Sequence, residues 1–306
     1  MTSTSNRIVV AGGGGFIGRA LCSVLLGAGY RVSVLTRGPA REGPNGLSFV
    51  TWDGASSRGW EAQADGALAL VNLAGENVAG GRWTAARRRA ILESRVLAGR
   101  AMAQAVERAA QKPKVLVQAS AVGYYGDTGD ALVDETRPGG QGFLAEVCRQ
   151  WEASSRAVED MGVRRVVVRT GLVLGRGGGM LERVLTPFRL FLGGPLGGGR
   201  QGFSWIHLED EVRAIRFLLE DERATGPFNL TAPGSVTNLE FCRELGRVLS
   251  RPCALPAPGA LLELVLGDMG RELLLWGCRA LPRRLSELGF AFTYPELGGA
   301  LRALLR

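Results

Sequence analysis

The chain has 306 residues, of which 46% are hydrophobic and 22% are charged, a globular composition that excludes a disordered or fibrous protein. Its net charge of +8 comes from 37 basic and 29 acidic residues. The arginines are spread along the chain and no nucleic-acid recognition motif accompanies them, so we expect no nucleic-acid partner.

The five cysteines are far apart and none forms a C-x-x-C pair. An odd number of scattered cysteines argues against a disulfide framework or a zinc site, so we expect no metal and a reducing, cytoplasmic location. No segment approaches the ~20 uninterrupted apolar residues that a membrane span needs. No apolar stretch of signal-peptide type precedes the first expected strand. We therefore expect no membrane partner.

Short valine-rich runs alternate with longer helical patterns in the first part of the chain. Such alternation is typical of a parallel sheet with helices on both faces. The sequence therefore predicts an α/β fold with a Rossmann-type, doubly wound parallel sheet. The expected strands are 7–11, 31–35, 47–52, 69–73, 115–119 and 165–169, and the expected helices are 20–26, 83–110 and 145–161.

The sequence changes character after about Gly175. Three glycine runs between residues 177 and 199 predict loops with unusual backbone angles or a close approach to a ligand. Helices are expected at 210–219, with Asp210 as the N-cap, and at 238–249. We expect residues 1–175, with further core elements in 204–232, to form the Rossmann core. Residues 176–306 are expected to form a smaller, mixed substrate-side and C-terminal region, with a final small domain at about 252–306.

A glycine-rich sequence directly follows the first expected strand. Read as G-x-x-G-x-x-G, it spaces Gly12, Gly15 and Gly18, with Phe16 and Ile17 between the last two. Gly12 and Gly15 allow a tight turn and let backbone amides approach a diphosphate, and Gly18 lets the next helix pack closely on the sheet. The N-terminus of that helix favours negative charge. A strand, this loop and a helix in succession predict a dinucleotide site.

The end of the second expected strand indicates which dinucleotide binds. NAD enzymes usually place an acid there for the ribose 2′-hydroxyl, but this chain has Thr36 followed by Arg37. Arg37 can pair bidentately with a 2′-phosphate, so NADP(H) is the expected cofactor, with a merely solvated Arg37 as the alternative. Asp53, after the third expected strand, is placed either to contact the adenine amino group or to cap a turn.

Several motifs, in order, resemble the YfcH-like epimerase family, an atypical, extended-type branch of the short-chain dehydrogenases/reductases. Besides the glycine signature they are 72–77 (NLAGEN), 120–126 (SAVGYYG), 169–175 (RTGLVLG) and 205–207 (WIH), and the segment 281–297 resembles the family's small C-terminal domain of unknown function. The resemblance implies an NADP-binding Rossmann fold, a small-molecule substrate and, as in much of the superfamily, a homodimer. By matching positions it implies cofactor contacts at Thr36, Arg37, Leu73, Ala74, Arg95 and Val173. From the residues alone, an exposed helical Arg95 is the alternative.

Typical members of the superfamily use a Tyr-x-x-x-Lys pair, in which the lysine lowers the pKa of the tyrosine. The only lysines here are Lys112 and Lys114, and no tyrosine has a lysine four residues later. The pair is therefore absent, and Phe143 stands roughly where the tyrosine would fall. Without the lysine, a tyrosine keeps a pKa near ~10 and is a poor base at neutral pH.

Three interpretations of the chemistry stay open. Tyr124 or Tyr125 acts as an acid while Ser120 orients a carbonyl. Alternatively His207, the only histidine, replaces the tyrosine, because its pKa suits proton transfer. The third interpretation is a non-catalytic module that senses the NADPH/NADP ratio. The sequence favours an NADP(H)-dependent oxidoreductase or epimerase-like protein that acts on an unidentified small carbonyl or hydroxyl compound.

Overall fold

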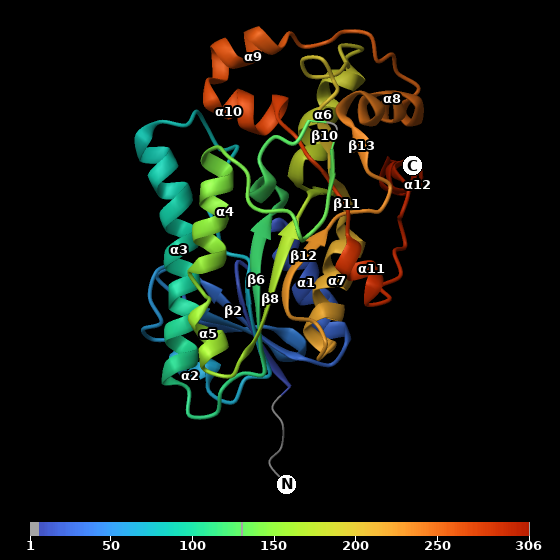
Figure 1. The fold of residues 1–306 in the computed structure, drawn as a ribbon. Coiled ribbons are helices and arrows are strands. Elements are labelled where there is room, and N and C mark those ends of the chain that lie inside the picture. The colour runs from blue at the N-terminus through green and yellow to red at the C-terminus, as the bar shows by residue number, and fades with distance from the viewer. Residues whose placement is uncertain (1–5, 130, 306) are drawn as a thin grey trace.

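The computed structural model describes residues 6–129 and 131–305. Its central sheet has eight strands in the order β12-β8-β6-β5-β1-β2-β4-β3 (Figure 1). All neighbours are parallel except the β3–β4 pair. The predicted α/β, doubly wound Rossmann fold is confirmed. The strands are β1 (Arg7–Ala11), β2 (Arg31–Thr36), β3 (Arg41–Glu42), β4 (Leu47–Thr51), β5 (Ala69–Asn72), β6 (Val115–Ala121), β8 (Arg164–Thr170) and β12 (Gly226–Leu230).

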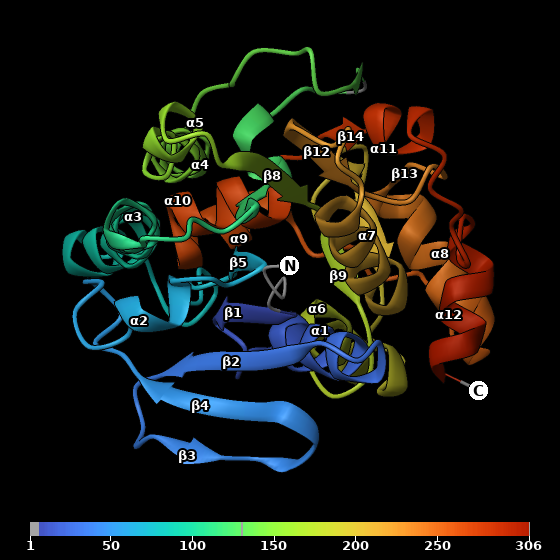
Figure 2. The ribbon, with the colours of Figure 1, turned by 90° about the horizontal axis from the view of Figure 1, so that it is seen from below.

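Helices cover the sheet on both faces (Figure 2). Successive side chains of a strand point to opposite faces, so Ile8 and Val10 pack into one core cluster while Val9 and Ala11 pack into another. The first cluster includes α1 (Phe16–Gly27) and α7 (Leu208–Glu220), and the second includes α2 (Glu61–Ala64) and α3 (Ala85–Arg108). Beside α3 lie α4 (Phe143–Ala153) and α5 (Ala157–Asp160), where the sequence predicted one continuous helix.

A third core cluster lies beyond the carboxyl ends of the strands (Figure 1). It joins three helices, α6 (Gly179–Arg189), α8 (Asn238–Leu249) and α12 (Leu297–Leu305), to two short strands, β10 (Gly202–Phe203) and β11 (Trp205–His207). Each of these strands has one partner: β10 pairs with β13 (Val236–Thr237), and β11 pairs with β9 (Leu172–Leu174). Two short C-terminal elements contact the first part of the chain. β14 (Arg279–Ala280) pairs with β7 (Leu132–Val133) outside the central sheet, and α11 (Arg283–Glu287) contacts β12 of that sheet. The predicted domain boundaries stay a prediction.

The remaining elements are short. They are the 3-10 turns η1 (Pro44–Gly46) and η2 (Val122–Tyr125), the helices α9 (Gly259–Leu266) and α10 (Asp268–Gly270), and the π-helical turn η3 (Arg271–Leu275). No helix in the described part of the chain is both long and apolar enough to cross a membrane.

The prediction that Asp210 caps helix α7 is wrong. His207 is the N-cap, because its Nδ1 accepts the backbone N–H of Glu209 at 3.1 Å. Asp210 lies in the first turn instead and is fully buried. Its carboxylate accepts the backbone N–H groups of Thr293 and Tyr294 at 2.9 and 2.8 Å, and it therefore ties the C-terminal segment to α7.

Candidate functional site

One position in the loop between β1 and α1, and one in the first turn of α1, have room only for glycine. Gly12 has a φ of +79°, and a Cβ there would lie 2.7 Å from the backbone carbonyl of Leu73 at the end of β5. A Cβ on Gly18 would lie 2.2 Å from the carbonyl oxygen of Gly12. Gly15 is the N-cap of α1, whose first turn carries no acidic residue. The result is a close-packed turn with an uncompensated positive helix end, which fits a diphosphate.

Phe16, the first residue of α1, supports a second glycine segment. A Cβ on Gly175 or Gly178 would lie 2.7 Å from the Phe16 ring. The segment after β9 therefore lies flat on this ring, next to the candidate cofactor loop. Val173 belongs to β9 and pairs with Ile206, while Ile17 packs into the core beneath α1. Phe16 thus joins the first loop to the substrate-side region.

The end of β2 leaves one cation without a partner. Thr36 accepts the backbone N–H of Gly38 on its Oγ1 at 3.1 Å. Arg37 is exposed and, among the described residues, makes no hydrogen bond or ion pair. Asp53 accepts the backbone N–H groups of Ala55 and Ser56, both at 2.8 Å, so it does cap a turn. Desolvation, the largest single effect, raises the pKa of Asp53, but these hydrogen bonds and one from the Ser56 hydroxyl together outweigh it and lower the pKa.

Arg95 holds the segment that follows β5. Its guanidinium donates to the carbonyls of Ile91 and Glu76 at 3.0 Å and lies 4.9 Å from the centroid of the Trp151 ring. Burial lowers the pKa of Arg95, and it is not the exposed helical arginine of the alternative interpretation. Leu73 and Ala74 lie in the same segment. Its backbone is also fixed by the N–H of Leu73, which donates to the carbonyl of Ala11 at 2.9 Å.

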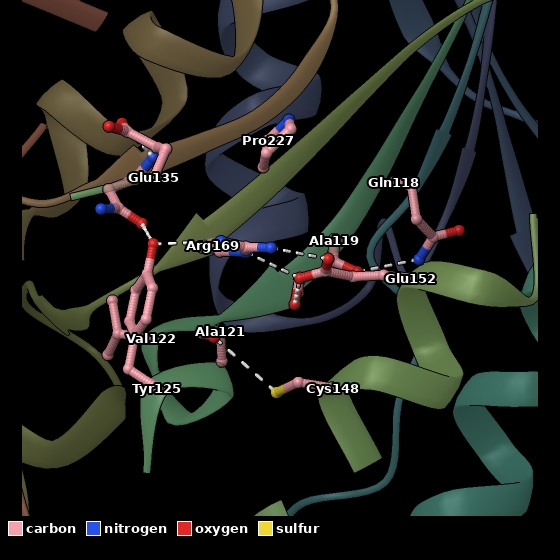
Figure 3. Close-up of polar contacts among 12 residues, drawn as sticks. Gln118, Ala119, Ala121, Val122, Tyr125, Glu135, Cys148, Glu152, Arg169 and Pro227 are labelled. Carbon is pink, nitrogen blue, oxygen red and sulfur yellow. Dashed lines mark hydrogen bonds and ion pairs between the residues drawn. The ribbon is translucent and has the colours of Figure 1, made fainter. Parts of the chain in front are cut away.

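A buried polar network joins two of the four candidate catalytic residues (Figure 3). Ser120 donates its hydroxyl proton to Glu152 at 2.7 Å, and Arg169 donates to both oxygens of Glu152 at 2.9 and 3.0 Å. Arg169 also donates to the Tyr125 hydroxyl at 3.1 Å, which in turn donates to Asn229 at 2.8 Å. Burial raises the pKa of Tyr125 to about 12. Both hydroxyls therefore have partners inside the protein.

Tyr124 is placed differently. Its ring is half-buried, and the guanidinium carbon of Arg169 lies 3.5 Å from the ring centroid. The Tyr125 ring meets it edge-on at 5.4 Å. Within the described residues the Tyr124 hydroxyl has no hydrogen-bond partner. Among the candidate hydroxyls, it is the one left for a bound molecule.

His207 lies apart from the network that holds Ser120 and Tyr125. Its ring packs on Tyr294, with 3.9 Å between centroids, and its Nδ1 is used in the N-cap of α7. Burial lowers the pKa of His207. No hydrogen bond or ring contact within the described residues joins it to the two tyrosines. The structure therefore brings Ser120, Tyr124 and Tyr125 together without His207.

The first turn of α4 is covered by the C-terminal segment. Phe143 is the first residue of α4, and its ring meets Trp83 at 5.0 Å. The backbone N–H groups of Phe143 and Leu144 donate to the two oxygens of Glu272, each at 2.9 Å. Four residues after Phe143, the side chain of Val147 is buried. No residue of this helix can therefore act as the usual tyrosine–lysine pair.

The family model described as "NAD dependent epimerase/dehydratase family" matches residues 8–231, and that of a domain of unknown function (DUF1731) matches residues 257–304. This chain belongs to the NAD dependent epimerase/dehydratase family. The resemblance to an epimerase family with a small C-terminal domain of unknown function is thereby confirmed.

Relatives of this epimerase family protein match it along nearly the whole chain. The epimerase family protein SDR39U1 of Bos taurus is 41% identical, over 98% of this chain and 99% of its own length. The epimerase family protein MT2273 of Mycobacterium tuberculosis is 40% identical, over 96% of both chains. An Arabidopsis thaliana relative, 39% identical over 98% of this chain and 86% of its own, is described as chloroplastic. A cytoplasmic location for this chain stays a prediction.

Solved structures agree with the fold. The human epimerase family protein SDR39U1, solved with NADPH, has a TM-score of 0.88 and 39% identity, covering 97% of this chain and 98% of its own. A nucleoside-diphosphate sugar epimerase from Corynebacterium glutamicum has a TM-score of 0.79 and 32% identity, covering 98% of this chain and 58% of its own. A UDP-glucose 4-epimerase from Thermus thermophilus, at 19% identity and a TM-score of 0.76, supports the fold alone.

The sequence did not single out the residues that organise this site. Glu152, Asn229 and Glu135 were not expected to matter, although Glu135 accepts the backbone N–H of Asn229 at 2.9 Å. One signal was available for Arg169, because a charged side chain inside a valine-rich central strand needs a buried partner.

Proposed function

We propose that this epimerase family protein binds NADP(H) through the β1–α1 loop and uses it on a small carbonyl or hydroxyl compound. The observation that carries the proposal is the combination of a close-packed glycine turn, a helix end without acidic residues, and Arg37 at the end of β2 with no partner among the described residues. A guanidinium at this place favours a 2′-phosphate, whereas an NAD site would hold a carboxylate. The human relative solved with NADPH supports the same cofactor.

The contacts proposed for the cofactor come from the glycine-rich sequence and from the resemblance. Gly12 and Gly15, with the backbone of Phe16 and Ile17, face the diphosphate, while Gly18 lets α1 pack closely at the end of β1. Thr36 and Arg37 face the adenine ribose. Asp53 lies near the adenine, while Leu73, Ala74, Arg95 and Val173 line the remaining path across the carboxyl ends of the strands. Of these, Arg95 acts through the 73–77 backbone, because its guanidinium is already used there.

Bound NADP(H) would supply or accept the hydride. For carbonyl reduction, the carbonyl carbon gains that hydride and its oxygen gains a proton from the Tyr124 hydroxyl. Tyr124 suits this role because its hydroxyl has no partner among the described residues and its ring lies on the Arg169 guanidinium. Ser120 and Tyr125 act as positioning residues, since both are bonded into the network that holds Arg169. His207 is the weaker candidate for the proton transfer, because its ring packs on Tyr294.

Calorimetric titration tests cofactor binding. NADPH should bind more tightly than NADH, and Arg37→Ala should remove most of that preference by deleting a charge-assisted bidentate contact. The matched control is Arg100→Ala, because Arg100 is also exposed and has no side-chain partner among the described residues, but lies within α3, away from the end of β2. No heat with either NADPH or NADP⁺ would refute the proposal.

The absent lysine favours the second candidate, a module that senses the NADPH/NADP ratio. Steady-state NADPH oxidation against a panel of carbonyl compounds separates the two. Tight NADPH binding without turnover of any substrate would favour the sensor. The homodimer implied by the resemblance stays a prediction, to be tested by the molar mass in solution.

A further inference from the structure

A cavity of about 510 Å³ opens next to the two tyrosines, a size within the usual range of roughly 300–1,000 Å³ for small-molecule sites. Its lining comes from three parts of the chain: Tyr125 and Asp127 after β6, the 137–141 segment before α4, and Trp276 from the C-terminal region. The cavity thus lies beyond the carboxyl end of β6, the edge of the sheet where ligands of such folds bind.

A single residue, Gly139, separates the cavity from Tyr124. Gly139 lines the cavity, and a Cβ on it would lie 3.1 Å from the hydroxyl-bearing carbon of Tyr124. Gly140 lies against the Tyr125 backbone, where a Cβ would come within 2.0 Å of the carbonyl oxygen. Its own N–H donates to the carbonyl of Tyr124 at 2.9 Å. This pair of glycines is therefore fixed to both tyrosines.

Two polar side chains of the lining have no partner within the described residues, the guanidinium of Arg137 and the amide of Gln141. Three other arginines are paired: Arg88 with Asp268, Arg149 with Glu146, and Arg169 with Glu152. Arg137 is exposed, so its guanidinium is open to a bound anion.

The same lining also offers an acceptor and an aromatic surface. Asp127 accepts the backbone N–H groups of Gly129 and Gly277 on one oxygen, both at 3.3 Å, and its other oxygen has no hydrogen-bond partner among the described residues. The Trp276 ring is half-buried, and a Cβ on Gly142 would lie 2.7 Å from it. The cavity therefore combines an anion contact, an acceptor for a hydroxyl group and a flat apolar wall.

We propose that this cavity is a further ligand site, which binds a small hydroxy- or oxo-carboxylate with a planar apolar body, the carboxylate on Arg137 and Gln141 and the body on Trp276. It lies beside the proposed reaction site, and Gly139 separates it from Tyr124. A carboxylate fits better than a phosphate, because one guanidinium fork matches two coplanar oxygens. The nearest helix N-terminus, that of α4, already holds the Glu272 carboxylate, so a third phosphate oxygen would lack a donor.

Calorimetry with mandelate and its neutral analogue mandelamide, on protein saturated with NADP⁺, tests the proposal. Mandelate should bind at least about tenfold more tightly, as a charge-assisted bidentate contact implies. Arg137→Gln should remove this difference, Arg137→Lys should keep part of it, and Trp276→Leu should weaken both probes. Arg100→Gln, a change of an exposed arginine on α3, should alter neither affinity.

Equal affinities for the two probes, no binding of mandelate at millimolar concentration, or a preference unchanged in Arg137→Gln would each overturn the proposal. NADPH titrations of the same samples keep the two ideas separate. If NADPH binds but the carboxylate preference is missing, the cavity assignment alone fails. If NADPH does not bind, the proposed function fails as well.

Discussion

Replacing Glu211 by glutamine should stabilise this protein at alkaline pH. Glu211 lies in α7 and is fully buried, with one oxygen accepting the Thr170 hydroxyl at 2.8 Å. Its other oxygen has no hydrogen-bond partner in the described structure. Burial raises the pKa of Glu211 from its ordinary value of 4.5 to about 8, so the folded protein holds this proton at neutral pH.

The free energy follows from the two pKa values. Below pH 4.5 the Glu211 carboxyl is protonated in both the folded and the unfolded chain, so it does not lower the free energy of unfolding. Above it the unfolded chain ionises first, and each further pH unit lowers the free energy of unfolding by about 1.4 kcal/mol. The loss is complete as the pH passes the folded value of about 8, and it sums to about 5 kcal/mol as an upper limit. Glutamine keeps the oxygen for Thr170 and has no proton to lose.

Urea denaturation of the wild type and Glu211→Gln at pH 5, 6, 7 and 8 measures this difference. The variant should gain stability relative to the wild type with rising pH, by about 1.4 kcal/mol per unit. Glu107→Gln, at an exposed position of α3, is the control and should show no such trend. A stability difference that stays constant from pH 5 to 8 would refute the reasoning.

Three further predictions concern the site. Gly18→Ala should abolish NADPH binding in calorimetry, since its Cβ would lie 2.2 Å from a backbone oxygen, whereas Gly14→Ala, with nothing within 4 Å, should fold normally as its matched control. Arg169→Met should lower the free energy of unfolding by about 3–5 kcal/mol in urea titrations, because it leaves a buried carboxylate unpaired; a loss below about 1 kcal/mol would contradict a buried pair. Tyr124→Phe should remove NADPH turnover but leave NADPH affinity unchanged, while Tyr125→Phe should mainly lower thermal stability; the reverse pattern would exchange their roles.

Much of the fold was accessible from the sequence because its signals are local. Valine-rich runs marked the central strands, and the spacing of Gly12, Gly15 and Gly18 marked the turn at β1. Contacts that join distant segments left no comparable trace. Ser120 and Tyr125 were both candidates, but nothing in the sequence showed that Glu152 would accept from Ser120 and that Arg169 would donate to Tyr125.

The N-cap of α7 also could not be predicted from local sequence. Asp210 precedes a helical pattern and is a preferred N-cap residue, yet the helix begins earlier, at Leu208. The carboxylate of Asp210 serves the backbone at Thr293 and Tyr294 instead. Those two residues lie more than 80 positions away, so no local pattern could have indicated this use.

The carboxylate of Glu272 completes the first turn of a helix that starts 129 positions earlier in the chain. Helix starts leave backbone N–H groups that need acceptors, and here a distant segment provides them. A chain that stopped before residue 257, where the match to the second family model begins, would lose this acceptor and the β14 partner of β7. The terminal region is therefore a part of the first region's own architecture, and a truncation that removes it also removes contacts that the first region needs.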